Sequence, residues 1–417
     1  MIAQRFRALG AVATATVLLS TAIACSSSGS SDGKITLTIA NSQWLDALRG
    51  KNLWAAVQEY EKTNGNVKLK QDAIPSKDFG SKITTQLGAG QGADVIIAQD
   101  GVFVTAAAGG SFVPLTSVVQ KATGLNDTSD AGVVNGTQYG VAWQRAAYAL
   151  VYNKTLLAQA GITEPPATVD ELIAAAKAVK AKTGAVGLAT RNSNADPSWY
   201  LDFENWLYGY GGGVFSADGK ITVNTPQNVA AVTAFKKMYD AGILATGDDM
   251  TTSRTRFKAG KVAFVFDNSG GTLNMATGGS VPSKDVGVTP LPFANPGAHQ
   301  QILVGVNKNS KNVRAATDFV TWLMSGAGQS ALRNASGPDT LATDVAQTKS
   351  FVADNPWAPT FEEVAPKSKS LLVTGHETKT AAIFAPVMDA VESVVVSGAD
   401  PATALAAAQG KAEAAAK

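Results

Sequence analysis

Short apolar runs alternate with amphipathic helical segments along most of this chain, and this alternation constrains the fold more than any other feature. Residues 35–39 alternate apolar and polar side chains, which is the period of a strand with one buried face. Residues 94–98 and 262–266 are mostly apolar throughout, as in strands covered on both faces. Between these runs the apolar spacing changes to that of helices. Strands that alternate with helices predict an α/β fold with largely parallel sheets.

Local signals predict where individual helices begin. Thr168 and Glu171 have the spacing of a capping box, and Thr225-Pro226 places proline at the first position of another helix. The alanine-rich end, residues 402–417, is weakly specified, and we expect it to form a surface helix that frays.

Length and charge limit the classes of function. The chain has 417 residues, which is enough for two lobes that each bury a core. Its formal net charge is only +2, so no broad basic surface is available to neutralise phosphates. We therefore expect no nucleic-acid partner.

The N-terminus has the pattern of a targeting segment. Arg5 and Arg7 precede an uncharged, mostly apolar stretch, residues 8–24, and Cys25 is the only cysteine in the chain. The residues before it resemble a bacterial lipobox. This predicts a signal peptide over 1–24, a lipidated Cys25 and a polar tether over 25–34, with an uncleaved anchor helix or a buried core cysteine as alternatives. More than one acyl chain on Cys25 would anchor the protein stably to the cell membrane.

Signatures of catalysis and of metal or cofactor binding are missing from the sequence. The two histidines, His299 and His376, cannot form an HExxH zinc site, and there is no Walker A motif. The glycine-rich residues 88–92 precede a strand instead of following one, so they are expected to be a loop. Residues 267–271 resemble the surroundings of a protease serine, but we expect a polar turn at the carboxyl end of the strand 262–266, where open α/β sheets bind ligands. We predict no catalytic residue, metal or cofactor.

Aromatic residues indicate a different kind of site. Flat apolar rings with polar neighbours suit sugars, which combine apolar C–H faces with hydroxyl rims. Trp44, Trp143 and Trp199 lie at strand ends or in a polar loop, where a ring can line a cleft. A position in the hydrophobic core is the equally open alternative for each of them.

An ordered set of segments resembles family 1 of the extracellular solute-binding proteins, the maltose-binding-like group. The segments that carry the resemblance are 139–143, 149–154, 160–172, 257–264, 315–323 and 400–405. The resemblance covers residues 35 to 412. It implies an α/β, two-lobed fold of the periplasmic-binding-protein type II class with a multi-crossing hinge. The implied parts are an N-lobe of 35–147 plus 306–352, a C-lobe of 148–300 plus 356–417, and hinge segments near 144–150, 300–306 and 352–356.

The resemblance also implies a function. The chain would be the monomeric, extracytoplasmic substrate-binding protein of an ABC importer. It would bind a mono- or oligosaccharide between the lobes and deliver it to the transmembrane subunits of the permease. Together with the patterns above, it gives as ligand-binding residues Asn41, Trp44, Asp100, Trp143, Gln144, Arg145, Asp196, Trp199, Tyr200, Asp267, Asn268 and His376.

Two alternatives stay open at this point. One is a receptor of the same fold for another solute, such as a polyamine, a phosphate ester or a metal chelate. The other is a secreted carbohydrate-active hydrolase that uses a pair of carboxylates such as Asp196 and Asp202.

Overall fold

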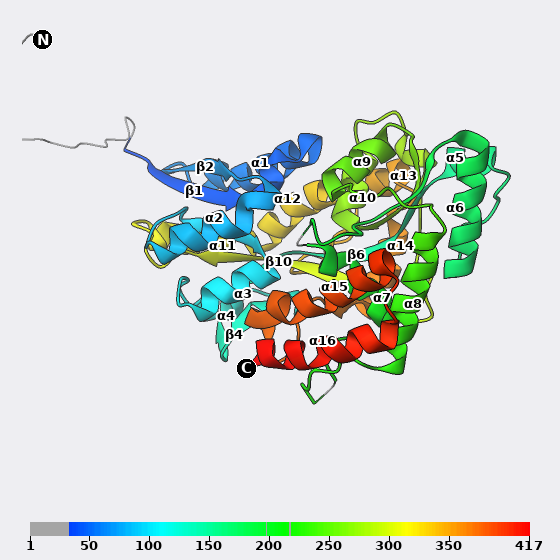
Figure 1. Ribbon diagram of the computed structural model, residues 1–417. Helices are drawn as coiled ribbons and strands as arrows, with labels where there is room; N and C mark the ends of the chain where they lie inside the picture. The colour runs from blue at the N-terminus through cyan, green and yellow to red at the C-terminus, as the bar shows by residue number, and fades with distance from the viewer. Residues whose placement is uncertain (1–32, 197, 217) are drawn as a thin grey trace, which may run out of the picture.

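A single mixed sheet runs through the protein and joins two hydrophobic cores (Figure 1). The structure is a computed structural model that describes residues 33–196, 198–216 and 218–417, so Cys25 and the signal segment lie outside the described residues. The strand order is β2-β1-β3-β10-β6-β8-β7, with β11 paired to β10 and β9 paired to β6. The strands are β1 (Ile35–Asn41), β2 (Val67–Ala73), β3 (Val95–Gln99), β6 (Val141–Asn153), β7 (Val186–Ala189), β8 (Val262–Asn268), β9 (Val286–Thr289), β10 (Ala298–Val306) and β11 (Lys369–Ser370). Strands β4 (Val133–Val134) and β5 (Thr137–Gln138) form a separate hairpin.

Strands β6 and β10 connect the two halves of the sheet. Residues Val141–Ala147 of β6 pair with β10, whereas Tyr148–Asn153 pair with β8 and β9. The 13 residues of β6 extend over about 40 Å, at 3.3 Å per residue. One strand is therefore long enough to contribute to both cores.

The first core lies around β1, β3 and the later part of β10. Its helices are α1 (Ala47–Thr63), α2 (Ser76–Gly88), α3 (Asp100–Ala108), α4 (Thr116–Lys121), α11 (Val313–Leu323) and α12 (Gly326–Ser336). Leu37 and Ile39 pack with Phe319 on one face of the sheet, and Ile96 packs with Phe103 on the other. We call this half the first lobe.

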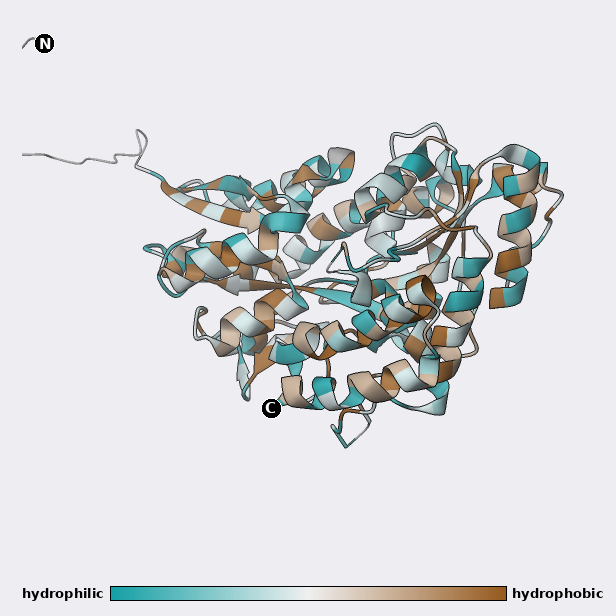
Figure 2. Cartoon of the chain, in the orientation of Figure 1, coloured by the Kyte–Doolittle hydropathy of each residue, from teal (hydrophilic) through white to brown (hydrophobic). Residues whose placement is uncertain are grey.

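The second core lies around β7, β8 and the end of β6. Its helices are α5 (Lys154–Gln159), α6 (Val169–Thr183), α7 (Trp199–Gly209), α8 (Pro226–Asp240), α9 (Met250–Lys258), α10 (Ser269–Met275), α13 (Lys349–Asp354), α14 (Pro359–Val364), α15 (Thr380–Ser397) and α16 (Pro401–Ala416). Figure 2 shows hydrophobic positions along the strands and alternating with hydrophilic positions around the helices. We call this half the second lobe.

The expected α/β class is confirmed, with one correction to the sheet. Strand pairs β1–β2, β1–β3 and β7–β8 are parallel, but β6 and β10 pair antiparallel with each other and with their other long neighbours. The sheet is therefore mixed and not largely parallel. The reason is that β6 carries the chain from the first lobe to the second and β10 carries it back.

Helix starts follow the sequence signals closely. The capping box at Thr168 and Glu171 forms at the start of α6, and Pro226 is the first residue of α8. Two expectations need correction. Ser269 to Gly271 are not a free turn but the first turn of α10, whose amides are capped by the side chain of Asn268. Helix α16 does not fray, because its Leu405, Ala408 and Ala412 are buried against the second core.

Among the described residues, one helix is long and apolar enough to span a membrane by length and composition, Glu377–Ser397. Half of that stretch is buried within the protein, and α15 contributes nine buried residues, among them Ile383 and Phe384, to the second lobe. Packing in the core accounts for its apolar composition.

Candidate functional site

The ligand-binding residues predicted after β1 lie together with Trp143 of β6 in a buried group that contains two aromatic rings. Asn41 caps the 3-10 turn Ser42–Leu45 by accepting from the amide of Gln43 at 3.0 Å. The indole Nε1 of Trp44 donates to the carbonyl of Ile39 at 3.0 Å, and that of Trp143 donates to Gln43 Oε1 at 2.8 Å. The two rings meet edge to face with centroids 6.0 Å apart. Trp44 and Trp143 are thus core residues of the first lobe in this conformation.

Asp100 lies where β3 ends and α3 begins, at the edge of the first lobe. It is only 4 % exposed. Its Oδ1 accepts from the amide of Gly101 at 2.9 Å, and its Oδ2 accepts from the amide of Gln301 at 3.4 Å. Burial raises the pKa of Asp100 to about 6, although these backbone amides act in the opposite direction.

Gln144 and Arg145 lie where β6 passes from one lobe to the other. Gln301 on β10 connects them, because its Nε2 donates to the Gln144 carbonyl at 3.2 Å and its Oε1 accepts from Arg145 Nε at 3.1 Å. Arg145 also forms an ion pair with Asp127 at 3.1 Å. The side-chain Oε1 of Gln144 is buried and has no hydrogen-bond donor. Buried acceptors of this kind are rare in folded proteins and ask for an explanation.

The second lobe contains a group of ion-paired side chains around Arg191. Arg191 forms ion pairs with Asp202 at 2.6 Å and with Asp196 at 3.0 Å. Burial raises the pKa of Asp202, whereas Arg191 lowers it. The carboxylates considered for a hydrolase are therefore both held by one guanidinium, which leaves neither of them free as an acid or a nucleophile.

Trp199 and Tyr200, the predicted ligand-binding residues on α7, have surroundings that differ from each other. Trp199 is buried against Phe203 and Phe235 in the second core. Tyr200 is half-buried and packs on Phe384 of α15 with ring centroids 5.2 Å apart. Burial is the largest cause that raises the pKa of Tyr200, and the negative charge of Asp100 adds to it. That electrostatic influence places Tyr200 of the second lobe near Asp100 of the first.

Asp267 and Asn268 end β8 and are both buried. Arg254 donates two hydrogen bonds to the Asp267 carboxylate, at 2.7 and 2.8 Å. Asn268 caps α10 through Oδ1, and its Nδ2 donates to Gln300 Oε1 on β10 at 3.3 Å. These hydrogen bonds hold the end of β8 to its neighbours. They use most of the hydrogen-bonding groups of both side chains.

A buried ion pair of the first lobe is joined to the second lobe beside this strand end by one hydrogen bond. Arg49 of α1 bonds Asp339 at 3.0 Å, and the hydroxyl of Ser269 on α10 donates to the other oxygen of the same carboxylate. Arg333 donates to the Asp339 carbonyl at 2.7 Å. Sequence analysis did not identify this group, since Arg49 and Asp339 are 290 positions apart. We call Arg49, Asp339 and Ser269 the interlobe clasp.

A cavity of about 700 Å³ lies between residues of both lobes. It is bounded by α3, the segment 127–135 and the segment 370–379, and it is lined by Arg145 and His376 from the expected set. His299 also lines it, and burial, followed by the charge of Arg145, lowers its pKa to about 4. His299 is therefore neutral at physiological pH and bonds Ser368 Oγ at 2.9 Å.

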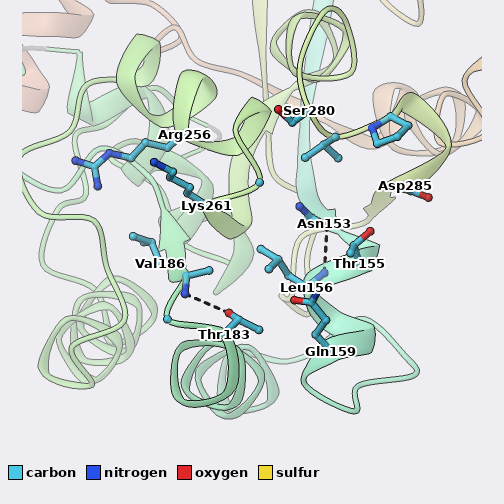
Figure 3. A pocket seen from close by; sticks show the side chains of 15 residues that line it. Asn153, Thr155, Leu156, Gln159, Thr183, Val186, Arg256, Lys261, Ser280 and Asp285 are labelled. Atoms are coloured by element: carbon cyan, nitrogen blue, oxygen red, sulfur yellow. Dashed lines mark hydrogen bonds between the residues drawn. The ribbon is translucent and has the colours of Figure 1, made fainter.

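A larger cavity, about 950 Å³, is shown in Figure 3. It is lined only by second-lobe residues, such as Leu156, Val186 and Lys261, and by none of the expected ligand-binding residues. Its place at the far end of the sheet separates it from the region between the lobes.

Sequence reasoning overlooked Glu204 on α7. This side chain is completely buried, and in the described part of the chain no donor bonds either of its carboxylate oxygens with good hydrogen-bond geometry. The available signal was local: α7 reads WYLDFENWLYG, a largely aromatic helix in which three polar side chains, Asp202, Glu204 and Asn205, are all buried.

Comparisons with known proteins agree with this architecture. The chain is similar to a binding protein from Brucella abortus, with 27% identity over 305 residues that cover 70% of this chain and 72% of that one. It is also 27% identical, over 53% of its length and 57% of the relative's, to the diacetylchitobiose-binding protein DasA of Streptomyces coelicolor. Among solved structures, the GacH receptor of Streptomyces glaucescens, studied unliganded and with acarbose, superposes with a TM-score of 0.80 at 24% identity. That match covers 92% of this chain and 98% of GacH.

A match to a family model identifies the family to which this chain belongs. The model for bacterial extracellular solute-binding proteins matches residues 47–330, more than half of the chain. The match spans most of the first lobe after β1, both connecting strands and the second lobe up to its C-terminal helices. This protein therefore belongs to the bacterial extracellular solute-binding protein family.

Proposed function

We propose that this protein is the carbohydrate receptor of an ABC importer, which binds a mono- or oligosaccharide between its lobes and passes it to the permease. The observation that carries this proposal is a group of buried polar side chains where the two lobes meet. Asp100 and Gln144 approach it from the first lobe and the connecting strand, and Tyr200 and Glu204 approach it from the second. Polar side chains from both lobes can form hydrogen bonds to opposite sides of one ligand, which suits a ligand with hydroxyl groups on all sides.

The relatives support a sugar as the ligand class. DasA is named for diacetylchitobiose, and GacH was solved with acarbose. Binding without turnover fits a region in which Asp196 and Asp202 are both ion-paired with Arg191. We propose that the twelve residues predicted from the sequence contact the ligand. The tryptophans among them would contact it when the lobes separate.

We propose a hinge between the lobes at the three crossings expected from the sequence, near 144–150, 300–306 and 352–356. The first two fall on β6 and β10, which serve both cores. Next to the first crossing, the backbones of Arg145 and Thr340, both in the first lobe, exchange hydrogen bonds at 2.7 and 2.9 Å. In this division the lobes are 35–147 plus 306–352 and 148–300 plus 356–417.

Membrane attachment completes the proposed role. A lipidated Cys25 followed by the tether 25–34 would hold the receptor, as a monomer, at the outer face of the cell membrane beside the permease. The family is extracellular, and an anchor limits diffusion away from the transporter.

A ligand panel tests the function directly. Purified protein is screened by thermal shift against mono- and oligosaccharides, polyamines and phosphate esters, because a bound ligand raises the melting temperature by mass action. We expect a rise for one carbohydrate class and recovery of that sugar intact after long incubation. Stabilisation by a non-sugar alone would contradict the sugar assignment, and consumption of the sugar would indicate a hydrolase.

A further inference from the structure

Helix α7 presents two different faces. Trp199, Phe203 and Trp206, spaced i, i+4 and i+7, pack around Phe235 of α8 in the second core. Tyr200, Glu204 and Tyr208, spaced i, i+4 and i+8, form the neighbouring face. The buried indole nitrogens of Trp199 and Trp206, which have no hydrogen-bond partner among the described residues, thus lie on a different face of α7 from Glu204.

The second face points towards β11 and the start of α15. Tyr200 packs on Phe384, and the Tyr208 hydroxyl donates to the carbonyl of Ser370 at 2.8 Å. Glu204 lies between the two tyrosines, and the Tyr208 hydroxyl is close enough to it to lower the pKa of its carboxyl group by hydrogen bonding, although the Tyr208 proton is directed to the Ser370 carbonyl. Burial raises the pKa of Glu204 well above its usual value. A fully buried carboxyl group without a neighbouring cation is unfavourable in its charged form.

Strand β10 brings Asp100 of the other lobe to the same place. The Gln301 amide donates to Asp100, and the Ala298 amide donates at 2.8 Å to Asn205, the residue next to Glu204. These two anchor points are three residues apart, or about 10 Å along the strand. Asp100 is also close enough to act on the pKa of Glu204.

A third acceptor lies at the same junction. Gln144 is held to β10 through Gln301, and its buried Oε1 has no donor. The unpartnered atoms here, one amide oxygen and two carboxylate oxygens, are all acceptors. The groups missing from this place are therefore hydrogen-bond donors.

The nearby cations in the described part of the chain are engaged elsewhere. Arg191 pairs with Asp196 and Asp202, and Arg254 pairs with Asp267. The Lys369 ammonium lies over the Tyr208 ring, 5.0 Å from its centroid. Asp100 and Glu204 thus form two buried acidic groups without a cation from these side chains.

We propose that Glu204 and Asp100 select solutes that carry a basic nitrogen, such as amino sugars with free amines. An ammonium group offers three donors, no acceptor and a positive charge, and so it matches both the missing donors and the uncompensated acids. A neutral hydroxyl supplies a donor but no charge. This inference rests on the carbohydrate function proposed above and narrows its ligand class.

The test compares three disaccharides and putrescine by titration calorimetry at pH 7 on the full protein in detergent. Chitobiose has free amines, diacetylchitobiose has neutral amides, and maltose has hydroxyls only. We expect chitobiose to bind at least tenfold more tightly than the two neutral sugars. Glu204→Gln, which keeps the size of the side chain, should reduce this preference at least tenfold. Glu363→Gln, at an exposed position of α14, serves as the matched control and should keep the preference.

The outcomes separate the two proposals. Equal binding of amine and neutral sugars by the wild type would overturn the selectivity and leave the sugar receptor intact, and so would an undiminished preference in Glu204→Gln. Binding of putrescine with no sugar bound would contradict the carbohydrate function and support the role of the carboxylates. Asp100→Asn provides the same comparison if circular dichroism shows that Glu204→Gln is unfolded.

Discussion

Buried carboxylates in this protein differ mainly in what surrounds them. Asp267 receives two hydrogen bonds from the Arg254 guanidinium, and Asp202 receives one from the guanidinium and one from the backbone amide of Arg191, so each is balanced within its own lobe. Among the described residues, Asp100 accepts only from backbone amides, and Glu204 has beside it only the Tyr208 hydroxyl, which donates to Ser370. The balanced pairs hold strand and helix ends in place. The two others lie between the lobes, where a ligand is the remaining source of donors.

Asp100 should contribute directly to ligand affinity. A hydrogen bond between a carboxylate and a sugar hydroxyl or amine is worth about 1.5–3 kcal/mol, so Asp100→Asn should weaken binding roughly 10- to 150-fold. Calorimetry with the stabilising ligand measures this. Asp318→Asn, exposed on α11, is the control. A dissociation constant that Asp100→Asn leaves unchanged would remove Asp100 from the site.

The raised pKa of Asp100 also predicts a pH-dependent stability. Its pKa is about 6 in the folded protein and near 3.8 when unfolded. The folded state therefore binds this proton more tightly, and its stability falls as pH rises from about 4 to 6. A shift of two pKa units corresponds to about 3 kcal/mol. Asparagine does not titrate, so the melting temperature of Asp100→Asn relative to wild type should increase between pH 4 and pH 7. Parallel pH profiles for the two proteins would refute this.

At the scale of elements, the contacts between α1 and α10 are as important as those within each lobe. Arg49 extends from α1 to Asp339, and Ser269 at the start of α10 bonds the same carboxylate. Gly270 allows this close approach of α1 and α10, because a Cβ at that position would lie 2.8 Å from Arg49 Nη2. Glycine at this position allows the guanidinium to lie directly against α10.

Removing the clasp carboxylate should destabilise the protein strongly. Asp339→Ala leaves the buried guanidinium of Arg49 without its main partner, and the loss of one member of a buried pair costs about 3–5 kcal/mol. Glu59→Ala, which breaks the exposed pair with Lys62, should cost less than about 1 kcal/mol. Urea unfolding of the two variants gives the comparison. Similar midpoints would show that the clasp contributes no more than a surface ion pair.

At the scale of the whole molecule, two cores share one sheet, and a ligand between them contacts both. A solute that touches both lobes fully only in the closed state shifts the equilibrium towards closure. To move an open-favoured ensemble from 1% to 99% closed, the solute must prefer the closed form by about 5.5 kcal/mol. A few charged hydrogen bonds are sufficient for this.

Ligand-driven closure should be visible in solution. Small-angle scattering should show a smaller radius of gyration when the stabilising ligand is added, and tryptophan fluorescence should change over the same concentration range. Trp143→Ala and Trp199→Ala should weaken both responses together, with Asp318→Asn again as the control. Should saturating ligand leave the scattering curve unchanged, the hinge mechanism is wrong.

Membrane attachment is the second prediction at this scale. Mass spectrometry of the membrane fraction should find an acylated Cys25 as the first residue of the mature protein. Cys25→Ala should abolish this processing and release the receptor from the membrane. An intact Met1 at the N-terminus of the wild type would contradict the assignment.

Much of the local structure could be predicted from the sequence. Thr168 and Glu171 start α6 as expected, and the apolar runs 94–98 and 262–266 coincide with β3 and β8 within two residues. These features depend on side chains that are close in sequence, so propensity and periodicity suffice to find them. The family, too, was recognisable from the order of such local segments.

Only the tertiary structure decided which residues meet between the lobes. Trp44 and Trp143 come together because β1 and β6 lie in one sheet, and their burial in the core follows from that pairing. Arg49 finds Asp339 across 290 positions, and β10 brings Glu204 near Asp100 through pairings that no local pattern encodes. A sequence determines the face of each element that is apolar. Which polar group then lacks a partner depends on how distant elements pack, since a hydrogen bond forms only where the fold places donor and acceptor about 3 Å apart.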